Sequence, residues 1–299
     1  MEYLIPFLLS AQYSINDPNV YNMPEYVFNF TKNWERHYDN STIGHGNILT
    51  ILKCQNSSFR SIICFVENSW TQTYIEVPGG TTKPLEPKFV RESCEKNLNR
   101  GLCEPFEIVF DKNGVTELVA PNDTDKSIYG SWWEMANQLN VLWISEIDLG
   151  GQLVPTFEST IHGKCNATIK ASKEKLGIDF LDKNKKFYRF KIDIDGGFDG
   201  MRFIYKKTRD VKTCTRGKKV LMADANSFLI YSLEMAMMRV VVSEYEFSSM
   251  FEDEISFILP DMETVINHHK IGLTLTEIRI AGDKIPPVKN PKSNPFTSG

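Results

Sequence analysis

The sequence lacks the short motifs that mark common catalytic and cofactor sites. It contains no GxSxG nucleophile elbow, no HExxH zinc motif, no phosphate-binding P-loop and no GxGxxG dinucleotide fingerprint. Histidine is sparse, with five in 299 residues, and the adjacent His268 and His269 would point to opposite faces of a strand. We therefore predict no catalytic residue and no cofactor, and we place a binding function ahead of an enzymatic one.

Metal-binding and membrane-spanning patterns are also missing. The six cysteines include no CxxC pair. Residues 193–200 (DIDGGFDG) have the acids and glycines of a calcium loop but not its closing glutamate, which favours a glycine-rich turn between two strands. No apolar run approaches the ~18 residues of a transmembrane helix. We predict no metal site and no transmembrane segment.

The cysteines and the glycosylation sequons indicate a secreted, extracellular chain. Sequons begin at Asn29, Asn40, Asn56, Asn122 and Asn166. Proximity pairs Cys54 with Cys64, Cys94 with Cys103 and Cys165 with Cys214, although six cysteines allow other connectivities. Residues 1–14 contain a short apolar stretch with no basic residue before it, so a signal peptide and a first strand both remain open for this segment.

Most of the chain has the period of β-strands. Residues 48–52 and 61–66 flank the turn-like QNSS and predict a hairpin. Residues 106–110 and 115–119 flank Asn113-Gly114, which suits the positive φ angles of a tight hairpin turn. Further strands are expected at residues 26–31, 155–162, 187–192, 201–205, 228–234, 239–247 and 271–280. This number of strands favours a mainly β chain that forms an antiparallel barrel or sandwich.

One segment has the period of a helix instead. Ile128, Trp132, Met135, Leu139 and Leu142 recur at steps of three and four and predict an amphipathic helix of about 15 residues. Its tryptophans require burial, so we expect the helix to fill or cover the mouth of a barrel. The proline-rich residues 285–299 are predicted to be a linker or a frayed end that holds neither strand nor helix.

Four blocks in fixed order resemble the N-terminal domain of the vitellogenin family of large lipid transfer proteins. They are residues 105–115 (PFEIVFDKNGV), the helix ending in Asn137-Gln138-Leu139, residues 159–165 (STIHGKC) and residues 205–214 (YKKTRDVKTC). The resemblance implies an antiparallel β-barrel that wraps a central amphipathic helix over residues 15–284, with Cys165 bonded to Cys214. Full-size members continue into a helical arch and lipid-lining sheets, so the chain is either a fragment or a short vitellogenin-like protein.

The strongest candidate site is a basic segment. Residues 182–219 hold 13 Lys or Arg and 5 Asp or Glu, whereas the whole chain has a net charge of −4. The candidate receptor-binding residues, which flank Cys214, are Lys206, Lys207, Arg209, Lys212, Arg216, Lys218 and Lys219. In vitellogenins the matching segment is implicated in receptor recognition, and calcium-chelating acidic modules of low-density-lipoprotein-family receptors suit lysine point charges.

Three other interpretations stay open for the chain. The basic segment is about as well explained by a solvated surface. Contact with nucleic acid or with an anionic membrane ranks lower, because the rest of the chain is acidic, and no nucleic-acid partner is expected. The alternative function is a small lipid carrier or a yolk or nutrient storage protein with an apolar ligand inside the barrel.

Overall fold

The structure is a computed structural model, and it describes most but not all of the chain. The described residues are 24–38, 41–58, 60–75, 90–93, 100–111, 114–140, 153–160, 163–176, 200–215, 218–224, 227–243, 245–258 and 264–295. The predicted signal segment, the strand at 187–192 and the loop at 193–199 lie outside these ranges.

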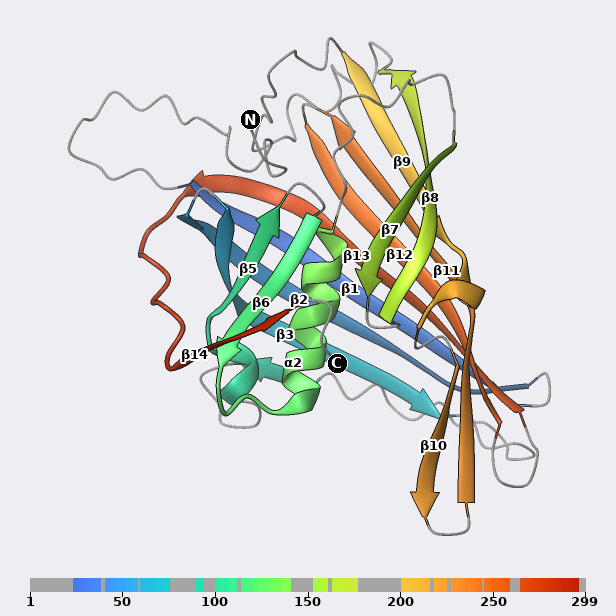
Figure 1. The fold of residues 1–299 in the computed structure, drawn as a ribbon. Helices are drawn as coiled ribbons and strands as arrows, with labels where there is room; N and C mark the ends of the chain where they lie inside the picture. Colours follow the sequence, from blue (N-terminus) through green and yellow to red (C-terminus); the bar gives the residue numbers. More distant parts are fainter. Residues whose placement is uncertain are drawn as a thin grey trace.

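One large antiparallel sheet dominates the fold (Figure 1). Its 14 strands follow the order β14-β6-β5-β3-β2-β1-β13-β12-β11-β9-β8-β7, with β4 paired to β3 and β10 to β11. The strands are β1 (Pro24–Tyr38), β2 (Ser41–Ser58), β3 (Ser61–Ile75), β4 (Val90–Ser93), β5 (Phe106–Asp111), β6 (Gly114–Pro121), β7 (Leu153–Thr160), β8 (Gly163–Lys175), β9 (Met201–Arg209), β10 (Lys218–Asp224), β11 (Ser227–Ser243), β12 (Glu246–Ile258), β13 (Thr264–Ile280) and β14 (Pro291–Pro295).

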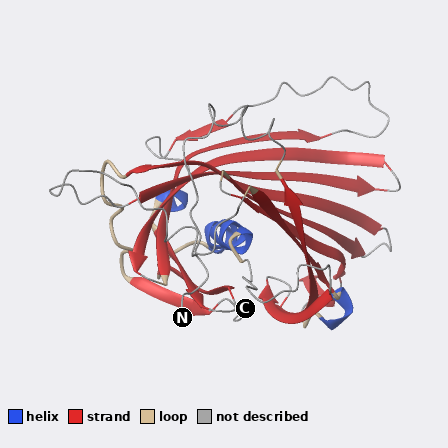
Figure 2. Cartoon of the chain, turned by 90° about the horizontal axis from the view of Figure 1, so that it is seen from above, coloured by secondary structure: helices blue, strands red, loops and turns tan. Residues whose placement is uncertain are grey.

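The sheet curves around a helix but does not close into the predicted barrel. Figure 2 shows helix α2 (Lys126–Gln138) inside the concave face of the curved sheet. The two terminal strands of the order, β14 and β7, are not paired with each other in the described part of the chain. Pro291 and Pro295 bound β14 and lack the backbone donor that a closing ladder needs, which suits an edge strand. The barrel prediction was therefore wrong in its closure and right in its mainly β content.

Helix α2 confirms the segment that the sequence predicts to be helical. Asp125 caps its N-terminus, because a side-chain oxygen accepts a hydrogen bond from the backbone N of Ser127 at 2.7 Å. Trp132 is fully buried and stacks on Phe106 of β5, with ring centroids 4.9 Å apart. Its indole nitrogen donates to the carbonyl of Leu102 at 3.2 Å. These contacts fix the apolar side of the helix against the sheet, as expected for buried tryptophan.

Both predicted hairpins are present, but residues 55–58, which were expected to separate the first pair of strands, belong to strand β2. Strands β2 and β3 pair antiparallel, with Cys54 directly opposite Cys64 and bonded to it. Strands β5 and β6 also pair, and Gly114 at the start of β6 has a φ of 106°. That angle is strained for any residue with a Cβ, so glycine is required there.

The prediction of a frayed tail was wrong. Residues 291–295 form strand β14 against β6. Before it, the buried Gln55 side chain donates to the carbonyl of Asp283 at 2.7 Å and accepts from the backbone N of Ile285 at 3.0 Å. Proline is excluded from a central strand but not from an edge strand. The side-chain amide of Gln55 in β2 supplies hydrogen bonds to the backbone of Asp283 and Ile285, before the strand begins.

The predicted strand at residues 239–247 was wrong in its bounds. Strand β11 ends at Ser243, and β12 begins at Glu246 and returns antiparallel beside it. Burial alternates along β12, with Phe247, Phe251 and Ile255 buried together with Ser249 and Asp253, and the intervening residues facing outward. The continuous apolar run before Ser243 hid the turn, because no glycine or proline marks it.

Candidate functional site

Strand β9 divides the predicted basic segment between two faces of the sheet. Side chains alternate along a strand, so neighbouring residues point in opposite directions. Lys206 is exposed, whereas Lys207 and Arg209 are only 7% and 4% exposed. Both side chains are therefore buried on the concave side of the sheet, a placement that fits the predicted receptor contact less well than the exposed Lys206 does.

Lys207 joins the end of the helix to the sheet, and Arg209 packs between strands of the sheet. The Lys207 ammonium donates to the carbonyl of Asn140, just beyond the C-terminus of α2, at 3.1 Å. This places a cation at the negative end of the helix dipole. The Arg209 guanidinium lies 4.8 Å from the ring centroid of Phe251 in β12, a cation–π distance. Tyr205, on the same face of β9, is buried, and its burial raises the pKa of its hydroxyl to about 12.

On the outer, convex face of the sheet, Lys206 lies within a row of cations that the sequence did not reveal. It pairs directly with Lys170 of β8 on one side and with Arg239 of β11 on the other. All three side chains are exposed. Directly opposed residues place their side chains about 5 Å apart on the same face. We call these three residues, Lys170, Lys206 and Arg239, the outer basic row.

The outer basic row has no acidic counterpart among the described residues. None of its three side chains makes an ion pair or a side-chain hydrogen bond there. Glu252, which lies on the outer face of β12 near Arg239, is 2.9 Å from Lys270 instead. Two like charges at this spacing repel by about 1 kcal/mol in water, so the fold does not gain stability from the row. Such an arrangement suits an external anionic partner.

A disulfide holds the end of the basic segment against strand β8. Cys165 of β8 is bonded to Cys214, the pairing expected from the sequence, directly after the short helix η2 (Val211–Thr213). The backbone N of Asn166 donates to the Thr213 hydroxyl at 2.9 Å. Lys212 is exposed on η2. The side chains of the remaining predicted residues, Arg216, Lys218 and Lys219, lie outside the described residues.

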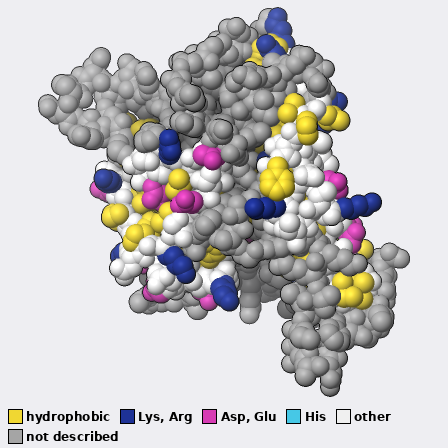
Figure 3. Space-filling view, in the orientation of Figure 1, with side chains coloured by type: hydrophobic (Ala, Val, Ile, Leu, Met, Phe, Trp, Pro, Cys, Tyr) yellow, Lys and Arg dark blue, Asp and Glu magenta, His cyan; other side chains and the backbone are white. Residues whose placement is uncertain are grey.

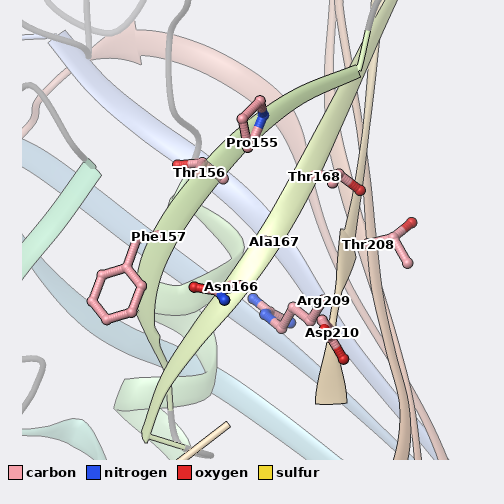
Figure 4. A pocket seen from close by; sticks show the side chains of 9 residues that line it. All are labelled: Pro155, Thr156, Phe157, Asn166, Ala167, Thr168, Thr208, Arg209 and Asp210. Atoms are coloured by element: carbon pink, nitrogen blue, oxygen red, sulfur yellow. The ribbon is translucent and has the colours of Figure 1, made fainter. Parts of the chain in front are cut away.

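A pocket of about 620 Å³ lies at the β7 edge of the sheet (Figure 4). Its walls include Phe157 of β7, Asn166 and Thr168 of β8, and Thr208 and Arg209 of β9. In the space-filling view, hydrophobic side chains gather at the surface over this end of the molecule with Lys and Arg side chains beside them (Figure 3). The pocket is thus lined by an aromatic ring, an amide, hydroxyls and a guanidinium.

The predicted modification sites differ in how accessible the structure makes them. Asn122 and Asn166 are exposed, and Asn29 and Asn56 are half-buried. The side-chain oxygen of Asn56 is fully buried. Cys103 is disulfide-bonded, while its predicted partner Cys94 and the sequon residue Asn40 lie outside the residues whose side chains are described.

His268 and His269 lie in strand β13 and face opposite sides of the sheet, as expected for neighbours on a strand. His269 lies 2.8 Å from the buried Asp253 on the concave face, and His268 lies 3.3 Å from Glu254 on the convex face. Within the described ranges, no three His, Cys, Asp or Glu side chains are placed to hold a metal ion. The helices of those ranges include none with the length and apolar character needed to cross a membrane.

Fold and site together define a curved antiparallel sheet that holds one helix and presents cations on its convex face. No family model and no curated protein matches the sequence. Eleven chains of solved structures match the fold. One is lipovitellin, in a structure concerned with lipid–protein interactions in that protein; the match has a TM-score of 0.63 and 9% sequence identity, and covers 92% of this chain and 27% of the lipovitellin chain. The chain therefore has a lipovitellin-like fold and spans about a quarter of the lipovitellin length.

Proposed function

We propose that the chain is a secreted, non-enzymatic binding module that docks on an acidic partner through the outer basic row. The observation that supports this function is the direct pairing of Lys170, Lys206 and Arg239 across three strands, with no acid of the described residues paired to them. A partner that supplies carboxylates would relieve their mutual repulsion, and exposed charges of this kind govern association rate and specificity.

The partner that best fits this chemistry is a receptor of the low-density-lipoprotein family. Its acidic, calcium-chelating modules would meet lysines as point charges. The resemblance of residues 205–214 to the receptor-recognition segment of vitellogenins supports the same partner, with Lys206 and Lys212 rather than Lys207 and Arg209 as the contacting residues. Lipovitellin-like architecture and two disulfides, Cys54–Cys64 and Cys165–Cys214, are consistent with an extracellular module.

Binding to an immobilised receptor ectodomain tests this proposal. We expect calcium-dependent binding that Lys206→Glu weakens about 2- to 30-fold, since reversal removes an exposed ion pair of about 0.2–1 kcal/mol and adds a repulsion of similar size. Lys292→Glu is the matched control, because Lys292 is exposed on β14 at the opposite end of the strand order. Equal effects of the two reversals, or binding that persists without calcium, would reject the receptor.

Lipid carriage or storage is the second candidate function, and the lipovitellin-like fold favours it. The described space between α2 and the sheet argues against a bulky ligand there, because Trp132, Phe28 and Phe247 fill it and are completely buried. Extraction of the purified chain followed by mass spectrometry would decide. Stoichiometric lipid in the extract would favour a carrier over a docking module.

A further inference from the structure

The outward face of strand β7 is apolar, which is unusual for an exposed edge strand. Leu153, Pro155 and Phe157 all point to solvent, and Leu153 and Phe157 are each 61% exposed. They are the two most exposed large hydrophobic side chains among the described residues. A contiguous apolar stripe of this kind marks a surface that something covers.

Phe157 lies directly opposite Asn166 across the β7–β8 ladder. The backbone N and O of Asn166 point away from β7, because the N donates to the Thr213 hydroxyl at 2.9 Å and the O accepts from the N of Asp210 at 2.8 Å. The pair is therefore a non-hydrogen-bonded pair, in which facing side chains lie closest. Phenyl ring and amide are immediate neighbours on one face.

Asn166 is also the first residue of an Asn-Ala-Thr sequon. Its side chain is exposed and makes no hydrogen bond within the described residues. Thr168, the third sequon residue, lies on the same face of β8 and is exposed. Figure 4 shows Asn166 between Phe157 and Arg209 at the pocket of about 620 Å³, which has room for a sugar ring. By contrast, Asn56 would have to withdraw a buried oxygen to carry a glycan.

We propose that Asn166 carries an N-linked glycan whose first sugar packs on the ring of Phe157 and covers the apolar stripe of β7. The inference rests on the secretion in the proposed function, because the modification occurs in the secretory pathway. The donor is a polyprenyl-diphosphate-linked oligosaccharide. Nδ2 of Asn166 loses one proton and bonds to C1 of the first N-acetylglucosamine, while the bond from C1 to the diphosphate oxygen breaks and the diphosphate leaves with the electron pair.

The physical reason is complementarity between the sugar and the stripe. A pyranose presents C–H groups on its face and hydroxyls on its rim, so it covers a phenyl ring while remaining hydrated. The arrangement removes exposed aromatic area from water and blunts an edge strand that would otherwise be free to pair with another chain. The glycan would also give the exposed Phe157 ring a packing partner, which the described protein residues do not provide.

Occupancy is tested on the full chain secreted from eukaryotic cells. Treatment with peptide-N-glycosidase in ¹⁸O-water, followed by peptide mass spectrometry, marks each formerly glycosylated asparagine. We expect Asn166 to be marked, and Asn122, exposed in a turn, reports that the chain met the glycosylation machinery. A marked Asn122 with an unmarked Asn166 overturns this inference and leaves secretion standing. Failure of the chain to be secreted, with every sequon unmarked, overturns both.

Stacking is tested by the coupling between ring and glycan. Phe157→Ser should lower the Tm of the glycosylated chain by ~2–4 °C, the shift expected for one aromatic contact in a domain of this size. In a Thr168→Ala background, which keeps Asn166 but removes the sequon, the same change should leave the Tm unaltered. Equal shifts in the two backgrounds overturn the stacking.

The same variants distinguish a lipid surface as the occupant of the stripe. The glycosylated chain should not bind vesicles of phosphatidylserine and phosphatidylcholine. Vesicle binding by the glycosylated chain that is lost in Leu153→Ser/Phe157→Ser would assign the stripe to a membrane and overturn the glycan cover.

Discussion

Lys206 and Lys207 are adjacent in sequence, and the structure assigns them opposite roles that mutation can separate. Lys207→Ala removes the hydrogen bond at 3.1 Å to the carbonyl of Asn140 and the cation at the end of α2. A hydrogen bond from a charged donor contributes about 1.5–3 kcal/mol, and a partly buried cation at a helix C-terminus contributes up to ~2 kcal/mol. Because the two contributions describe one contact and overlap, we expect a loss of about 2–3 kcal/mol.

Lys206→Ala removes an exposed side chain that repels its neighbours Lys170 and Arg239. We expect a change in unfolding free energy within about 0.5 kcal/mol of zero. Guanidinium unfolding followed by the intrinsic fluorescence of the five tryptophans, with the disulfides intact, measures both variants under one condition. Equal destabilisation by the two substitutions, or a larger effect of Lys206→Ala, would refute the division of the basic segment between the two faces.

Three further perturbations test the supports of the fold. Removing the Cys165–Cys214 bond, with a sequence separation of 49, should destabilise the chain by about 4 kcal/mol, and removing Cys54–Cys64, with a separation of 10, by about 3 kcal/mol. The difference arises because the bond that closes the longer loop removes more entropy from the unfolded chain. Unfolding of the two paired Cys→Ala variants measures both losses, and a larger loss for Cys54–Cys64 would contradict this reasoning. Gln55→Leu should make residues 285–295 more sensitive to limited proteolysis by removing the bonds to Asp283 and Ile285, whereas cleavage unchanged from the parent would show that β14 needs no such anchor. Hydrogen bonds from Ser127 lower the pKa of Asp125 below its ordinary value of 3.8, so the helix cap stabilises fully above that value and its contribution is lost as the pH falls through the folded pKa. The difference in unfolding midpoint between the parent and Asp125→Ala should therefore be constant from about pH 7 to 5 and shrink below about 3.8. A difference that persists in acid would exclude the carboxylate cap.

Local features of the fold were predictable because they depend on nearby residues. Asn113-Gly114 between two apolar runs specified the β5–β6 hairpin, and the spacing from Ile128 to Leu139 specified α2. Closure of the sheet was not predictable, because it depends on whether β14 and β7, far apart in sequence, meet in space. The placement of β14 was not predictable either, because the segment before it is held by the side-chain amide of Gln55, which is distant in sequence.

Part of the candidate site was predictable, because that part also depends on residues near in sequence. Composition located a basic segment, but the period of two along β9 already implied that Lys206 and Lys207 face apart, and this signal was available in the sequence. The partners of Lys206 were not available, because Lys170 and Arg239 become its neighbours only through strand register. Asn166 and Phe157 are likewise nine residues apart and become neighbours only through the β7–β8 hairpin register.

The measurement that most directly tests the account is receptor-ectodomain binding by two matched variants. The outer variant is Lys170→Glu/Lys206→Glu/Arg239→Glu, and the inner variant is Lys207→Met/Arg209→Met, assayed below its unfolding temperature. The account predicts that the outer variant loses affinity by at least about tenfold while the folded inner variant binds like the parent chain. An outer variant with unchanged affinity, or a folded inner variant that no longer binds, would contradict it.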